Sequence, residues 1–161
     1  MVDIRILFEK ITRFIDRAKS RRLLIQTHDI PDPDAIASAE AFRVMARHFG
    51  VDAAIVSNGL PQRRENRVLL RECMITLKPL ESLKIRKPEH CAWAYIDCLP
   101  GGGNVTIHPL APGDLFIAID HHGRPKSTLK FDPGEFLIEE PDAGAPATPP
   151  GESPTAIGLP I

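Results

Sequence analysis

The sequence predicts an α/β domain in which helices flank a parallel β-sheet. Short apolar runs, typical of buried strands, alternate with longer amphipathic segments, and this alternation favours a parallel sheet. Three of the runs end at a histidine or an aspartate. The chain has 161 residues, enough for one domain with a sizeable core.

The first third of the chain predicts a helix, a strand and a second helix. Apolar residues recur at steps of three and four over residues 4–18, which predicts an amphipathic helix. The apolar run 23–25 predicts a buried strand ending near His28. A second helical pattern covers residues 34–48, and Gly50 is a plausible end signal for it.

Later segments continue the alternation. Residues 53–56 predict a strand and residues 63–72 a short helix. Two further apolar runs, 92–96 and 115–119, predict strands that end at aspartates, and 136–138 is a candidate fifth strand.

Prolines divide the rest of the chain. Pro79 and Pro88 leave residues 74–90 without an assigned element. Residues 141–161 contain six prolines and three glycines without an apolar period, which predicts an irregular tail. We therefore expect one domain over residues 1–140, followed by this tail.

Composition excludes several classes of protein. The formal net charge of −1 argues against a generic surface for polyanions. No apolar run is long enough to span a membrane, and residues 1–10 lack the features of a signal peptide. The three cysteines show no CxxC spacing, which suits a reducing compartment, so we expect a cytoplasmic protein.

The first polar cluster follows the predicted strand 23–25. It places His28 and three carboxylates, Asp29, Asp32 and Asp34, within seven residues. So much negative charge in one place is costly unless a cation neutralises it. An ordinary polar turn, with Asp34 capping the next helix, remains an equal alternative at this point.

Two more clusters follow later strands. Asp97 ends the run 92–96, and Asp120, His121 and His122 follow the run 115–119. Because ligands bind at the carboxyl ends of parallel strands, the three clusters should share one edge. Mixed imidazole and carboxylate ligands suit Mn²⁺, Co²⁺, Fe²⁺ or Zn²⁺, and Asp97 could bridge two ions roughly 3.5–4 Å apart.

These three motifs resemble the signature of the DHH phosphoesterases, a superfamily that includes RecJ-like exonucleases, nanoRNase-type oligoribonucleases and family II pyrophosphatases. The resemblance covers about residues 10 to 145. It rests on His28-Asp29-Ile30-Pro31-Asp32-Pro33-Asp34-Ala35, on Ile96-Asp97 and on Ile119-Asp120-His121-His122. It implies a Rossmann-like DHH domain holding two divalent cations, with Mn²⁺ as the expected metal.

The resemblance also implies individual roles. His28, Asp32 and Asp97 resemble the ligands of the first metal. Asp34 and His121 resemble ligands of the second, which Asp97 would share.

Other residues resemble the catalytic and substrate-contacting groups of the family. Asp120 looks like a partner that orients an imidazole, and His122 like the histidine that contacts the substrate phosphate. The stretches 64–67 and 97–104 are similar to one bacterial branch of the family, which makes Arg64 and Asn104 candidate substrate contacts.

The sequence departs from the family pattern near its end. The resemblance implies a fourth aspartate motif and a C-terminal substrate-binding domain, and both would lie beyond Ile161. Where the family continues with a helix, this chain has a proline-rich segment, as after a truncation or a frame shift. We therefore expect an incomplete second metal site, reduced activity and possible homodimer formation.

These observations lead to one function with two alternatives. The expected function is hydrolysis of phosphate esters in short oligonucleotides or nucleotides, through water activated by two metals. The alternatives are a pyrophosphatase or polyphosphatase, and a non-catalytic remnant that binds metal or nucleotide.

Overall fold

The computed structural model describes residues 4–85, 87–109, 111, 115–122 and 137–139. Six parallel strands form one sheet in the order β3-β2-β1-β4-β5-β6. This is the strand order of doubly wound dinucleotide-binding folds, so the predicted α/β class is confirmed. The strands are β1 (Arg22–Gln26), β2 (Ala53–Ser57), β3 (Leu77–Pro79), β4 (Cys91–Ile96), β5 (Phe116–Asp120) and β6 (Leu137–Glu139).

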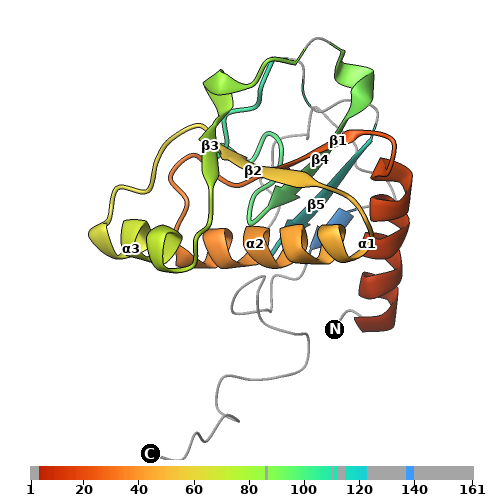
Figure 1. Ribbon diagram of the computed structural model, residues 1–161, viewed down its shortest axis with the longest axis horizontal. Coiled ribbons are helices and arrows are strands. Elements are labelled where there is room, and N and C mark those ends of the chain that lie inside the picture. The colour runs from red at the N-terminus through yellow and green to blue at the C-terminus, as the bar shows by residue number, and fades with distance from the viewer. Residues whose placement is uncertain (1–3, 86, 110, 112–114, 123–136, 140–161) are drawn as a thin grey trace, which may run out of the picture.

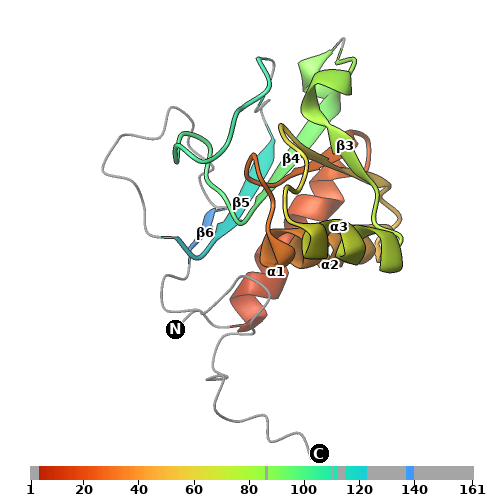
Figure 2. The same ribbon diagram turned by 90° about the vertical axis from the view of Figure 1, so that its left-hand side faces the viewer.

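Three α-helices lie on one side of these strands, as Figures 1 and 2 show. They are α1 (Ile4–Ala18), α2 (Pro33–His48) and α3 (Arg64–Glu72). The Asp32 side chain caps α2 by accepting a hydrogen bond from Ala35 N at 3.0 Å, and Pro33 occupies the first helical turn, where it costs little. Gly50 follows the helix with a φ of +80°, which fits its predicted role as an end signal.

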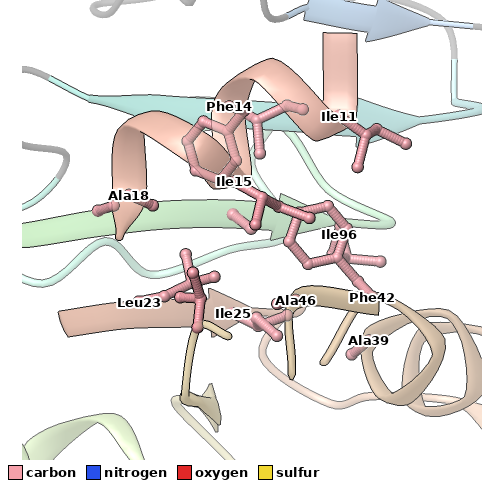
Figure 3. Packing of buried hydrophobic residues seen from close by; sticks show 14 of the residues in the cluster. Ile11, Phe14, Ile15, Ala18, Leu23, Ile25, Ala39, Phe42, Ala46 and Ile96 are labelled. Atoms are coloured by element: carbon pink, nitrogen blue, oxygen red, sulfur yellow. The ribbon is translucent and has the colours of Figure 1, made fainter. Parts of the chain in front are cut away.

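The main core lies between α1, α2 and the sheet (Figure 3). Phe14 and Ile15 of α1 are fully buried and meet Phe42 of α2, with the Phe14 and Phe42 rings 6.3 Å apart. Leu23 and Ile25 of β1 point into the same cluster. Their alternate neighbour Leu24 faces the opposite way, as the two-residue period of a strand requires.

A second apolar cluster covers the other face of the sheet. It centres on Trp93 and Tyr95 of β4, whose rings stack with centroids 6.1 Å apart. Within the described residues this face is covered by irregular chain and by the short 3₁₀ helix η1 (Leu80–Ser82), rather than by α-helices, and a second 3₁₀ helix, η2 (Pro88–His90), directly precedes β4.

The structure places a strand and two 3₁₀ helices within residues 74–90, where the sequence predicted no element. Leu77–Pro79 forms the edge strand β3, where a proline is tolerated because one side of the strand needs no hydrogen bonds. The predicted fifth strand is present as β6. The predicted tail, residues 141–161, lies outside the described residues, and the domain boundary stays a prediction. No helix among the described residues is long and apolar enough to cross a membrane.

Candidate metal centre

The three polar clusters meet at one edge of the sheet because of the strand order. β1, β4 and β5 are neighbours, all parallel, so the residues that follow them lie side by side. This edge includes the point between β1 and β4 where the strand order reverses, which is where open α/β sheets bind ligands. The expected convergence of the three motifs is therefore seen in the structure.

Asp97 lies at the centre of the cluster. Its carboxylate oxygens are 3.6 Å from His28 Nε2 and 3.3 Å from His121 Nε2, and it is only 2% exposed. His122 Nδ1 lies 3.6 Å from Asp97 Oδ1 as well. One carboxylate thus faces three imidazoles that come from two different strand ends.

The backbone at Asp97 explains how a strand end can present this side chain. Its φ of +59° is a left-handed conformation, which carbonyl crowding makes unfavourable for most residues other than glycine, asparagine and aspartate. The Asp97 N–H still donates to Ile119 O at 2.9 Å, so the turn stays anchored to β5. Strain of this kind occurs often at functional sites.

Burial also controls the charge of Asp97. Removal from water, reinforced by the negative charge of Asp34, raises its pKa to about 7. Its Oδ1 atom is buried and accepts no hydrogen bond in the described structure. A buried carboxylate oxygen that accepts no hydrogen bond, even with imidazoles nearby, costs free energy, and a bound cation would offset that cost.

Two potential ligand sets share this residue. His28, Asp32 and Asp97 form one set, and Asp97, His121 and His122 form the other, with the ligand atoms of each set within 4.8 Å of one another. The mixture of imidazole and carboxylate fits a divalent transition metal. The donor sets and the Asp97 oxygen that accepts no hydrogen bond together show that these residues could bind metal ions.

Burial lowers the pKa of His28, although nearby Asp32 partly opposes it. Near neutral pH the imidazole is therefore uncharged, which is the form that binds metals. His122 behaves differently. Burial alone would lower its pKa, but the hydrogen bond to Asp120 and the surrounding carboxylates raise it overall.

Asp120 holds His122 in place. Its Oδ1 accepts from His122 Nδ1 at 2.7 Å and from the His122 backbone N–H at 3.1 Å. Because Nδ1 is engaged by this carboxylate, Nε2 is the nitrogen left to face a ligand. This geometry suits the orienting role expected for Asp120.

Asp34 lies close enough to raise the pKa of Asp97, and its Oδ1 is 3.4 Å from Ser38 Oγ in the first turns of α2. The geometric sets do not include it, whereas they include His122, which the sequence resemblance placed on the substrate. The assignments of Asp34 to the second metal and of His122 to the substrate therefore stay predictions.

The two other substrate-contact candidates differ in position. The Asn104 carbonyl accepts from Asp29 N at 3.0 Å, so its backbone adjoins the metal-motif loop while its side chain is exposed. Arg64 is exposed at the start of α3. The nearby buried Asn66 contacts the motif loop directly, because its amide donates to Pro31 O at 3.3 Å.

Asp29 has a structural role that its place in the acidic cluster concealed. Its two carboxylate oxygens accept from Thr106 N and Thr106 Oγ1, both at 2.7 Å. Its carbonyl accepts from Gly59 N at 2.9 Å, and a Cβ on Gly59 would lie only 2.6 Å from that oxygen. Asp29 therefore ties together the loops that follow β1, β2 and β4. The sequence carried no signal for this pairing across 77 positions.

Most of this chain is similar in sequence to part of a longer curated protein. No family model matches the chain. An uncharacterized protein of Methanocaldococcus jannaschii is 32% identical over 133 residues, which cover 83% of this chain but 26% of that protein. The chain thus spans about a quarter of the length of this curated relative.

A solved structure gives the second comparison. The crystal structure of an exopolyphosphatase-related protein from Bacteroides fragilis matches with a TM-score of 0.54 and 14% identity, covering 86% of this chain and 41% of that one. At this level of identity the likeness concerns the fold. The chain therefore shares an α/β fold with that protein and carries a cluster of acids and histidines able to bind metal at the carboxyl edge of its sheet.

Proposed function

We propose that this chain forms the metal-binding core of a phosphohydrolase that cleaves phosphate esters of short oligonucleotides or nucleotides. The observation that carries the proposal is the position of Asp97, which two sets of potential ligands share. A carboxylate shared in this way is what a site for two neighbouring cations requires. The order and spacing of the motifs, which resemble the DHH phosphoesterases, support the same reaction class.

Different residues would hold the two cations. His28, Asp32 and Asp97 would hold one cation, and Asp97 with His121 and either Asp34 or His122 would hold the other. Divalent ions held there, Mn²⁺ in our proposal, would lower the pKa of a bound water, so that hydroxide is available near neutral pH. They would also neutralise charge on the phosphoryl oxygens.

His122 would act on the substrate. The raised pKa favours its protonated form, which donates hydrogen bonds to phosphoryl oxygens. Asp120 would keep the ring oriented through Nδ1, so that Nε2 carries the proton toward the substrate. If His122 instead binds metal, it must be neutral, and the two roles are therefore distinguishable by pH.

A specific observation favours a second candidate substrate. The structural neighbour is described as exopolyphosphatase-related, so phosphoanhydrides are the alternative to phosphate esters. A non-catalytic module that binds metal or nucleotide is the third reading.

The first test is calorimetric titration of the chain with Mn²⁺, beside Asp97→Asn and the control Asp52→Asn. Asp52 is exposed and lies outside both ligand sets. We expect saturable binding that Asp97→Asn weakens at least a hundredfold and that the control leaves unchanged. Absence of Mn²⁺ binding by the folded wild-type chain would contradict the proposal.

Analysis of the hydrolysis products then separates the three functions. The chain is incubated with Mn²⁺ and a dinucleotide, a nucleoside monophosphate or tripolyphosphate, and the nucleosides, nucleotides and phosphate formed are measured. Cleavage of the ester substrates, lost in Asp97→Asn, supports the proposal. Cleavage of tripolyphosphate alone supports the polyphosphatase alternative, and metal binding without turnover supports the non-catalytic one.

A further inference from the structure

A second concave site lies at the amino ends of the parallel strands, opposite the metal centre at their carboxyl ends. β1 begins at Arg22 and β4 begins at Cys91, and these two residues pair in register. His28 and Asp97 follow the other ends of the same strands. Strands of this length span roughly 17–20 Å, so a small ligand at one edge cannot touch the other.

The site is a cavity of about 310 Å³. Its lining consists of Arg22, Lys84, Ile85, Lys87, His90 and Cys91. Three of these side chains are cations, and no carboxylate lines the cavity. In the described part of the chain, none of the three cations forms an ion pair with a carboxylate. Positive charge is therefore concentrated here in a chain whose net charge is −1.

The wall of the cavity is held by the backbone before β4. His90 N donates to Lys87 O at 3.0 Å, and the Cys91 thiol approaches the same carbonyl at 4.0 Å. Cys91 is 4% exposed and belongs to the apolar cluster on this face. The cationic side chains thus surround an apolar floor that is fixed to the sheet.

Electrostatic effects at Cys91 place the arginine charge close to this floor. Burial raises the pKa of the thiol, while the positive charge of Arg22, followed by that of Arg21, opposes the rise. Glu89 is the acid that acts against them there. The cations that line the cavity itself are Arg22, Lys84 and Lys87.

We propose that this cavity binds a small oligophosphate anion. Several converging cations match an anion that carries more than one charge, and the volume is at the lower end of the about 300–1,000 Å³ typical of small-ligand sites. A long nucleic acid would instead require a basic stripe across the surface, which the net charge of −1 does not favour. This site is independent of the proposed hydrolysis, because it needs none of the metal ligands.

The test is calorimetric titration of the whole chain with sodium tripolyphosphate in EDTA at low ionic strength. We expect one saturable site, with an affinity that falls as salt rises. The double variant Lys84→Ala/Lys87→Ala should weaken binding at least tenfold, and Arg22→Gln should weaken it by a similar factor. Lys78→Ala, which removes an exposed lysine outside the cavity, should leave it unchanged.

Three outcomes would overturn the proposal. One is the absence of saturable binding by the wild-type chain, and another is equal weakening by Lys78→Ala. The third is binding of a short oligonucleotide without any binding of tripolyphosphate. Asp97→Asn should bind tripolyphosphate like the wild type in EDTA, so a failure of the metal-dependent reaction leaves this result readable by itself.

Discussion

Asp97→Asn should stabilise the metal-free chain at alkaline pH while removing its metal site. The raised pKa of Asp97 means that the folded state holds its proton up to about pH 7, whereas the unfolded chain releases it near the ordinary pKa of 3.8. Between these values the folded state binds more protons, so the free energy of unfolding falls as pH rises. Asparagine has no proton to lose, and it tolerates the left-handed backbone at this position.

The magnitude follows from the shift. About three pKa units at about 1.36 kcal/mol each give a cost of about 4 kcal/mol above pH 7, of which about 1.5 kcal/mol is already present at pH 5. The gap between variant and wild type should therefore move by about 2–3 kcal/mol in favour of the variant from pH 5 to pH 8. Comparing two pH values cancels the separate cost of burying an amide, which does not change with pH.

Urea unfolding in EDTA, followed by circular dichroism at both pH values, measures this gap. Saturating Mn²⁺ in place of EDTA should then narrow the gap at pH 8, because a ligand at 100 times its Kd stabilises the wild type by about 2.7 kcal/mol. A gap that stays constant within about 0.5 kcal/mol across the pH range would refute the idea that burial of ionised Asp97 destabilises the metal-free chain.

Further predictions concern the site and the core. Mn²⁺ affinity should fall about tenfold for each pH unit below 7, because Asp97 must lose its proton to bind metal; titrations at pH 5.5, 6.5 and 7.5 measure this. Asp29→Ala should lower the free energy of unfolding in urea by about 2–4 kcal/mol, since Thr106 loses two hydrogen bonds to a charged group, while Mn²⁺ stoichiometry is retained. Gly59→Ala should cost about 1–3 kcal/mol in the same assay, because its Cβ would press on the Asp29 carbonyl. Phe14→Ala should cost about 3–5 kcal/mol through the cavity that it leaves, and a loss below 1 kcal/mol would contradict the described core.

The sequence by itself determined the elements and the class of the fold. Apolar periods are local, so α1, α2 and the buried strands could be predicted to within one or two residues. The edge strand β3 could not, because three residues that include Pro79 carry no period.

The sequence also indicated which residues would lie together in the metal site, since ligand-binding residues follow the carboxyl ends of parallel strands. His28, Asp32, Asp97, His121 and His122 were all among the predicted site residues, and the structure brings them together. The separate roles of Asp34 and His122 were not determined in this way, because they depend on distances between segments far apart in the chain.

Only the tertiary structure decided how these residues are held and charged. The strand order places β4 beside β1, and that packing buries Asp97, turns its backbone to positive φ and raises its pKa. It also pairs Asp29 with Thr106, which gives one acid of the motif a structural role. Burial and pairing across the sheet arise from contacts between distant segments, and a local pattern of residue types contains no information about such contacts.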